Sequence, residues 1–356
     1  MALGQGSQAV GFAEVPDFHV EVARLLDPTI ADSSVIVGGD PAKRGKVVSA
    51  SQELRRLGIA EGMAVAEALD RAPGARWVRT NIQRAREVSG ALRAAVREEV
   101  EAVEVDGLCG FYMRAPREES EALGLAARLE ERVRERTGLP LRVGVAPARF
   151  AARLAAEDAG HRGACVIVSE DFESYLMRQP LERLPGVGPK TAARLAELGA
   201  VDLPGLLDLG PARLEVLLGN HGRTLWRLAC GEDPKPLRVR RHPETLSREE
   251  TLAEPVRDRA GLVASVQRLS ESLAGALRRD GLSAGRIALR VTSLDEHTVT
   301  RSCTLATPVG SAKELAQHAG ALIERMELSD VGVRRTSLVL KGLEARGASD
   351  RQLDLF

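Results

Sequence analysis

Residues 184–192 read LPGVGPKTA, which matches the turn of a helix–hairpin–helix motif. Gly186 and Gly188 allow a tight turn whose backbone N–H groups can point at a phosphate. Lys190 and Thr191 open the helix that follows, and its N-terminus adds positive potential. Such a turn grips a nucleic-acid backbone without reading its sequence. A plain connection between two helices is the alternative interpretation, but a glycine pair followed by PKTA and an apolar helix favours DNA binding.

Periodic patterns on the N-terminal side of this motif predict an α+β protein with a mostly antiparallel sheet. Alternating or continuous apolar runs bounded by glycine and proline predict strands at 10–15, 34–37, 47–51, 141–146 and 166–168, with a strand–turn–strand at 103–112. Helical periodicity predicts helices at 52–57, 82–101, 118–137 and 148–157. Residues 184–218 then change to short helices separated by glycine turns.

A proline- and arginine-rich stretch, residues 234–243, reads as an interdomain linker. Beyond it the pattern is a strand, a helix at 258–279, strands at 286–293 and 297–305, a helix at 311–328 and a strand at 335–343. This order predicts a small βαββαβ unit.

Composition limits the classes of function. A chain of 356 residues and 38.2 kDa predicts two to four domains. The formal net charge is zero, so any nucleic-acid affinity must come from local patches. The four cysteines are far apart and none forms a CxxC pair, which argues against zinc and for reduced thiols in the cytoplasm. We expect no membrane span and no signal peptide.

Basic residues cluster in the linker and in the unit that follows it. The candidates for DNA contact are Arg238, Arg240 and Arg241 in the linker, and Arg248, Arg290 and Arg301 beyond it. The alternation at 291–292 and 298–300 predicts that polar and basic groups, with Arg290 and Arg301, share one sheet face. A solvated charged surface is the alternative, but threonine and arginine alternating beside a basic linker favour contact with phosphates.

The last five residues, 352–356, read QLDLF after a polar stretch of small residues. Apolar side chains on a polar tail suit insertion into a pocket of another protein. The string resembles the peptide by which bacterial replication proteins hold the β sliding clamp. The expected clamp contacts are Gln352, Leu353, Asp354, Leu355 and Phe356, and a C-terminus packed on its own core is the alternative.

From about Val10 onward the chain resembles Y-family (translesion) DNA polymerases, close to the DinB or polymerase IV branch. The strings that carry the resemblance are VIVGG at 35–39, VVSAS at 47–51, RVGVA at 142–146, the motif at 184–192, GRTLWRLACG at 222–231, LSREET at 246–251 and the terminal QLDLF. The resemblance implies a right-hand architecture with palm, fingers, helical thumb and βαββαβ little finger. The implied boundaries are palm 1–42 and 77–168, fingers 43–76, thumb 169–233, linker 234–243, little finger 244–346 and a clamp-binding tail at 347–356.

The same resemblance implies nucleotide transfer with two Mg²⁺ ions held by carboxylates. In such enzymes an Asp ends the first strand and an Asp-Glu pair lies on a later hairpin. Here those positions are Glu14 and Asp106-Gly107, so Glu14 and Asp106 are the residual catalytic and metal-binding candidates. Glycine cannot bind a metal through a side chain.

Other positions of the nucleotide site also depart from the family pattern. Pro16 stands where a second acid is usual, His19 replaces the bulky aromatic that screens the sugar, and Gln52 replaces a tyrosine. Arg55 is kept and Arg153 stands in place of a lysine. His19, Gln52, Arg55 and Arg153 are therefore the candidate nucleotide-binding residues.

Several changes in one site, with the DNA-holding parts kept, predict a homologue that is inactive or impaired. It would bind primer-template DNA and the clamp during DNA damage tolerance. It would resemble the non-catalytic ImuB type that recruits another error-prone polymerase, although it lacks that type's long C-terminal extension. One alternative is an active polymerase that uses Glu14 and Asp106 with a substitute ligand. If the alignment of the first strand is shifted, Asp17 or Glu21 is the ligand instead of Glu14. Another is a DNA-binding protein that senses nucleotides without touching the clamp.

Overall fold

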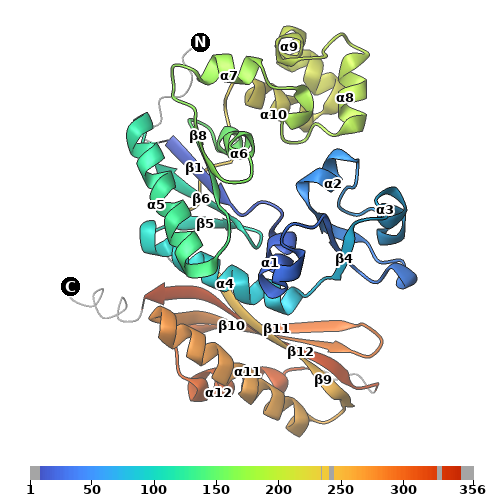
Figure 1. Cartoon of the computed structure of the whole chain (residues 1–356). Helices are drawn as coiled ribbons and strands as arrows, with labels where there is room; N and C mark the ends of the chain where they lie inside the picture. Colours follow the sequence, from blue (N-terminus) through green and yellow to red (C-terminus); the bar gives the residue numbers. More distant parts are fainter. Residues whose placement is uncertain (1–8, 234, 240–243, 327–330, 346–356) are drawn as a thin grey trace, which may run out of the picture. The chain divides into compact units, whose positions relative to one another are not determined.

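A computed structural model describes residues 9–233, 235–239, 244–326 and 331–345 of the chain (Figure 1). The chain divides into two compact units, residues 1–241 and 242–356. This division falls inside the stretch 234–243 that the sequence predicts as a linker. No helix of the described residues is long and apolar enough to cross a membrane.

The first unit is built on a five-stranded sheet with the strand order β5-β6-β1-β7-β8. Its strands are β1 (Ala9–Glu14), β5 (Val103–Asp106), β6 (Gly110–Ala115), β7 (Arg142–Ala146) and β8 (Gly163–Val166). All neighbours are antiparallel except β7 and β8, so the prediction of a mostly antiparallel sheet is confirmed. The last strand begins three residues earlier than the predicted 166–168, because it pairs beside β7 from Gly163 onward.

Both faces of this sheet are buried, and the alternation along β1 decides which side chain faces which core. Ala13 lies in the core that includes buried residues of α4 (Ile82–Glu99) and α5 (Glu119–Thr137). Phe12 points the other way, into the core that α6 (Arg149–Asp158) shares with the helices beyond it. Gly144 lets α6 pack directly on β7, because a Cβ there would lie 2.0 Å from the Ala152 carbonyl oxygen.

A second, three-stranded sheet has the order β3-β2-β4, with β2 (Val35–Gly38), β3 (Val47–Ala50) and β4 (Arg76–Arg79). Around it lie the helices α1 (Phe18–Leu26), α2 (Gln52–Arg56) and α3 (Val65–Arg71) and the 3₁₀ turns Pro28–Ile30 and Pro41–Lys43. The sequence patterns predict β2, β3 and α2 but miss α1, α3 and β4. β4 shows no alternation because three of its four residues are exposed.

The rest of the first unit is helical. It contains α7 (Phe172–Met177), a 3₁₀ turn at Leu181–Arg183, α8 (Pro189–Ala196), α9 (Leu203–Leu218) and α10 (Asn220–Ala229). Leucines dominate its core, and α9 is kinked where Gly210 adopts a φ of 72° before Pro211. The prediction of short helices with glycine turns is confirmed here.

The second unit is a four-stranded antiparallel sheet with helices on one face. Its elements are β9 (Thr245–Val256), α11 (Arg259–Asp280), β10 (Leu282–Ser293), β11 (Thr298–Val309), α12 (Ala312–Ile323) and β12 (Val333–Ala345), and the sheet order is β11-β10-β12-β9. Leu289 and Leu338 meet residues of both helices in the core. The predicted βαββαβ order is confirmed, although α12 ends at Ile323 rather than at 328.

Candidate functional site

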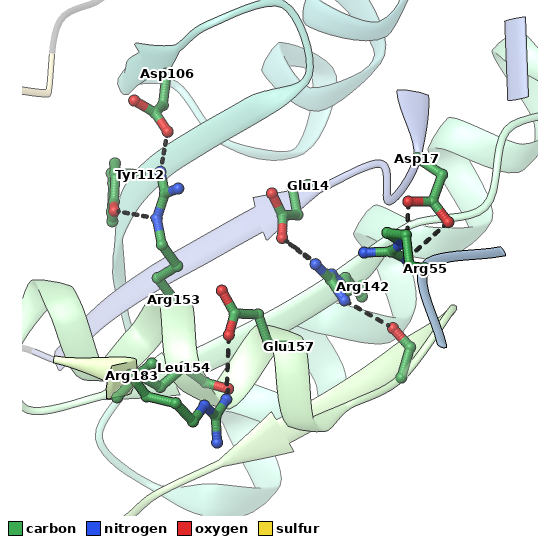
Figure 2. Close-up of polar contacts among 11 residues, drawn as sticks. Glu14, Asp17, Arg55, Asp106, Tyr112, Arg142, Arg153, Leu154, Glu157 and Arg183 are labelled. Atoms are coloured by element: carbon green, nitrogen blue, oxygen red, sulfur yellow. Dashed lines mark hydrogen bonds and ion pairs between the residues drawn. The ribbon is translucent and has the colours of Figure 1, made fainter. Parts of the chain in front are cut away.

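The two residual carboxylates lie at the same end of the five-stranded sheet (Figure 2). Glu14 ends β1 and Asp106 ends β5, and Gly110 of β6 is the register partner of both. Two strand spacings separate their backbones by about 10 Å. The strand order therefore brings together two acids that are far apart in the sequence, as expected for the family's site.

An arginine neutralises the first of these acids. Arg142, at the start of β7, donates from Nε and Nη2 to Glu14 Oε1 at 3.0 and 2.5 Å. Its Nη1 donates to the Gly160 carbonyl at 3.2 Å. Both side chains of the pair are largely buried, with exposed fractions of 15% and 16%. Figure 2 shows the Arg142 guanidinium lying against one oxygen of the Glu14 carboxylate, on the side away from Asp106.

A second arginine neutralises Asp106. Arg153 of α6 forms an ion pair with the Asp106 carboxylate, and its Nε donates to the Tyr112 hydroxyl at 3.0 Å. The same guanidinium lies 4.6 Å from the centre of the Phe12 ring. Arg153, predicted to contact a nucleotide, is thus engaged by the chain's own side chains.

The donor set does not fit a two-metal centre. Gly107 lies in the turn after Asp106 with a φ of 64° and supplies no ligand. Within the described residues, no three His, Cys, Asp or Glu side chains gather as a metal site requires. Burial, with the charges of Glu14 and Asp106, raises the pKa of the neighbouring Cys109 thiol to about 12, so this thiol stays protonated at neutral pH. The role of Glu14 and Asp106 as metal ligands stays a prediction. In the structure, each of these carboxylates forms an ion pair with an arginine.

The alternative ligands Asp17 and Glu21 lie beyond β1, at the start of α1 and within it, and each forms an ion pair. Asp17 caps α1 with a φ of 50°, and both carboxylate oxygens lie 2.8 Å from Arg55 Nη2. Burial raises the pKa of Asp17 even though Arg55 opposes this shift. Glu21 pairs with Arg24 at 2.9 Å. The candidate nucleotide residue Arg55 is thus held by an acid of its own chain.

The other two nucleotide candidates lie near this pair in the fold. His19 is on the first turn of α1, where burial lowers its pKa. Gln52 is the first residue of α2 and is exposed. Within the described residues, the structure shows no hydrogen bond from His19 or Gln52 to Glu14 or Asp106.

Sequence reasoning missed a contact between the hairpin and the start of the linker. Glu104, two residues before Asp106, accepts from Arg149 Nη1 at 2.6 Å and from the backbone N–H of Arg238 at 2.7 Å. The backbone N–H of Phe150 donates to Asp233 at 3.0 Å. These bonds hold Asp233 and Arg238 against the five-stranded sheet and α6.

The helix–hairpin–helix motif forms a compact turn. Gly186 has a φ of 93°, and Gly188 caps α8 in an extended conformation with Pro189 at the first helical position. Lys190 is exposed and Thr191 is half-buried. A cavity of about 710 Å³ joins this turn to the acid end of the sheet, lined among others by Asp106, Arg153, Arg183, Gly186, His221 and Lys235.

The register of the second unit corrects one expectation. Arg290 pairs with Thr300, whereas Arg301 pairs with Leu289, whose side chain is in the core beneath the helices. Opposed residues share a face, so Arg290 and Arg301 lie on opposite faces rather than on one. The Nε of Arg301 donates to the Arg325 carbonyl at 3.3 Å. Arg248 also faces the helix side, where its Nε donates to Ser272 at 3.2 Å.

The face without helices is polar and basic. With Arg290 it carries Arg286, Arg335 and Lys341, with the acids Glu249 and Glu344, and rows of hydroxyl side chains at Thr245, Ser247, Thr251, Thr292, Thr298, Thr300, Ser302, Thr304 and Ser337. We call these residues the open sheet face. Sequence reasoning missed its other three cations, although counting in steps of two from Arg290 reaches Arg286. Arg240, Arg241 and the tail residues 352–356 lie outside the described residues.

Family models and known structures match nearly the whole chain. A model of the impB/mucB/samB family matches residues 14–157, the C-terminal domain of that family matches 243–355, and the IMS family HHH motif matches 169–200. The structure is similar to DinB from Sulfolobus solfataricus, with a TM-score of 0.72 and 22% identity, over 94% of this chain and 98% of that one. It is also similar to Dbh DNA polymerase in an insertion ternary complex, with a TM-score of 0.70 and 21% identity over the same shares.

Curated relatives share more of the sequence. DNA polymerase IV of Halorhodospira halophila is 32% identical over 342 residues, which is 95% of each chain. DNA polymerase IV of Alkalilimnicola ehrlichii is 31% identical over 343 residues, 95% of this chain and 96% of that one. The chain therefore belongs to the Y family of DNA polymerases, on its DinB or DNA polymerase IV-like branch.

Proposed function

We propose that this chain binds DNA during damage tolerance but has lost, or nearly lost, nucleotide transfer. It would act on DNA as an accessory protein held by the β sliding clamp, in the manner of the ImuB type. The observation that carries the proposal is the state of the acid end of the sheet. Glu14 and Asp106 are each paired with an arginine, and Gly107 supplies no third carboxylate.

The energetic argument concerns the metal ions. Arg142 donates both of its bonds to Glu14 Oε1, so a Mg²⁺ ion bound at this carboxylate would lie beside a largely buried guanidinium of the same charge sign. Loss of one carboxylate from a two-metal site already costs several kcal/mol of transition-state stabilisation. Two acids are paired with arginines and a third carboxylate is absent at Gly107. Together these features support a rate of nucleotide transfer that is lower by several orders of magnitude.

DNA binding rests on two surfaces that do not need the metal site. The turn at Gly186–Gly188 and the exposed Lys190 suit a phosphate backbone. The open sheet face offers four cations and rows of hydroxyls, which also suit phosphates. Relatives named DNA polymerase IV and a solved neighbour described as a post-insertion binary complex of a DNA polymerase support a primer-template as the ligand.

The clamp contact and a partner enzyme complete the proposal. The terminal string 352–356 supports binding to the β sliding clamp. Such a protein would bind primer-template DNA and the clamp without extending the primer. It would then recruit a second, error-prone polymerase to the same site. We propose a cytoplasmic location because its DNA and clamp partners lie there in bacteria.

Primer extension tests the loss of activity. The purified chain is incubated with labelled primer-template, the four deoxynucleotides and either Mg²⁺ or Mn²⁺, and DNA binding is measured in the same preparation. We expect binding without template-directed extension. Robust extension that disappears in Asp106→Ala would overturn the proposal, because a dead site cannot lose activity through that change.

The second candidate is an active error-prone polymerase in which Glu14 and Asp106 bind Mg²⁺ with a substitute ligand. Two observations favour it: the carboxylates lie at the same end of the sheet, and polymerase IV relatives match 95% of the chain. The residues available for such ions would be Glu14 and Asp106, after their arginines move away. The extension assay separates the two candidates directly.

A further inference from the structure

The loop between β2 and β3, together with β4, places cations around an exposed indole that the proposed function does not use. Residues 38–50 contain three cations and β4 adds two, against one acid, Asp40. The Asp40 carboxylate accepts a bond from the Ala42 N–H at 2.9 Å, so it is turned toward its own loop. The cations Lys43, Arg44, Lys46, Arg76 and Arg79 are all exposed.

The Trp77 ring is held at the base of this loop. Its Nε1–H donates to the Gly39 carbonyl at 3.2 Å, while 37% of the residue stays exposed. Gly39 donates in turn to the Lys46 carbonyl at 3.0 Å. A Cβ on Gly45 would lie 2.3 Å from the Gly39 carbonyl carbon, so the two ends of the loop cross in contact. The indole is therefore oriented by the backbone that carries the basic loop.

Four of the five exposed cations lie beside the indole, Arg79 on its face of β4 and the others on the loop that it touches, whereas Arg76 leaves the opposite face of the strand. Arg79 follows Trp77 by two residues on β4, so both side chains leave the same face of the strand. Lys43 ends the 3₁₀ turn Pro41–Lys43, and Arg44 follows it in the left-handed conformation with a φ of 57°. The short turn thus presents two neighbouring cations outward.

We propose that Trp77, Arg79 and the basic loop 40–46 form a binding site for single-stranded nucleic acid. A free base stacks on an aromatic face, and cations beside it take the flanking phosphates. A base within a duplex already stacks on its neighbours and offers no free face. An acidic peptide would use the cations but not the ring, so the oriented indole favours a nucleic acid. This site goes beyond the primer-template contacts proposed above, which use other elements.

Fluorescence of Trp77 gives a direct test. The chain has two tryptophans, and Trp226 is half-buried against the helical core. Trp226→Phe leaves Trp77 as the reporter in an otherwise complete chain. Titration with a labelled oligo-thymidylate is followed by tryptophan emission and by the anisotropy of the label in the same sample. We expect saturable quenching with the same midpoint as the anisotropy change.

Surface variants locate the phosphates. In the Trp226→Phe chain, Lys43→Glu and Arg44→Asn should each weaken the quenching midpoint by about fivefold at moderate salt. Asparagine is chosen at residue 44 because it tolerates a positive φ. Lys313→Glu, an equal charge reversal at an exposed position on α12, should leave the midpoint unchanged.

Three results would overturn the proposal: no binding of the oligonucleotide, binding without quenching, or quenching that ignores Lys43→Glu but follows Lys313→Glu. Displacement of a bound oligonucleotide by polyglutamate without any prior quenching would instead indicate an acidic protein segment as the ligand. None of these results depends on primer extension, so this site and the loss of polymerase activity fail or stand separately.

Discussion

Glu14 keeps the charge of the acid that ends the first strand in the family, yet its neighbour Arg142 changes what that charge can do. The ion pair satisfies a carboxylate that is only 16% exposed. Arg153 has the same effect on Asp106, but that pair is about 40% exposed on each side. At the scale of single residues, the two acids are therefore screened from solvent to different degrees, and removal of the arginine should cost more stability at Glu14 than at Asp106.

Arg142→Ala should lower the free energy of unfolding by about 3 kcal/mol, because it leaves a largely buried Glu14 without its partner. The matched control is Arg71→Ala, which breaks the exposed pair with Glu67 and should cost less than about 0.5 kcal/mol. Denaturant unfolding of both variants provides the measurement. Equal, small losses would mean that solvent already screens Glu14.

Asp17 should make stability depend on pH in an unusual direction. Burial raises the pKa of its carboxyl above the ordinary value of 3.8, so the folded state holds this proton more tightly than the unfolded state. The contribution is therefore favourable below pH 3.8 and is lost as the pH rises through the raised pKa. Asp17→Asn, which is neutral and tolerates the left-handed backbone, should raise Tm at pH 7, and the gain should shrink toward pH 4.

Asp27→Asn is the control with the opposite sign. Hydrogen bonds from the Thr29 side chain and backbone lower the pKa of Asp27, so its contribution is present above the ordinary pKa and is lost as the pH falls through the lowered one. This variant should lower Tm at pH 7. A lower Tm at pH 7 for Asp17→Asn would show that its pair with Arg55 outweighs the cost of burial.

At the scale of elements, strand register decides which arginines lie on the open sheet face, where we propose that DNA binds. Arg290 and Arg301 look equivalent as basic residues on neighbouring strands. The pairing of Arg290 with Thr300 and of Arg301 with Leu289 places them on opposite faces, because side chains alternate along a strand. The open sheet face therefore holds Arg290 with Arg286, Arg335 and Lys341, and not with Arg301.

Arg290→Glu should weaken duplex DNA binding roughly tenfold at low salt and reduce the salt slope by about 1. Arg301→Glu makes the same change of charge on the helix side and should alter affinity less than about twofold. Lys190→Glu in the helix–hairpin–helix turn should weaken binding to all sequences alike. Fluorescence anisotropy at several salt concentrations measures all three, and equal losses for Arg290→Glu and Arg301→Glu would contradict the open face as the DNA contact.

At the scale of the whole molecule, the elements that we propose to contact DNA are divided between the two units. The first unit carries the helix–hairpin–helix turn and the second carries the open sheet face, and residues 234–243 join them. Once one unit has bound DNA, the linker keeps the other unit at a high effective concentration near the same DNA. Two weak contacts can therefore give one stable complex. In the proposed function, a chain of zero net charge would bind DNA through these two local surfaces.

Deletion of residues 352–356 should abolish binding to the β sliding clamp and leave affinity for free DNA unchanged. The physical reason is that Leu353, Leu355 and Phe356 are the apolar anchors of the proposed contact. Surface-bound clamp and anisotropy with DNA give the two measurements, and Asp354→Ala serves as a milder change in the same segment. Unchanged clamp binding after the deletion would favour a DNA-binding protein without a clamp contact.

The sequence by itself predicted the long, periodic elements, and its resemblance to the family predicts a metal site that lacks a carboxylate. The helices near 82–99, 119–137 and 259–280 and the strands of the second unit follow from local periodicity, which is why they were found within a few residues. Short elements such as β4 and α3 were missed because few of their residues are buried. The expectation that Gly107 stands in place of a glutamate came from the resemblance to the family, and the hairpin pattern around Asp106 only located the position.

Only the tertiary structure decided what surrounds the remaining acids. Glu14 meets Arg142 because β1 pairs with β7 across 128 positions of sequence, and Asp106 meets Arg153 because α6 packs over that sheet. The faces of Arg290 and Arg301, and the indole of Trp77 beneath the basic loop, depend on register and on crossing backbones in the same way. The local pattern of residues along a segment predicts which helix or strand that segment forms. Strand order and packing bring distant side chains together, and no local pattern contains that information.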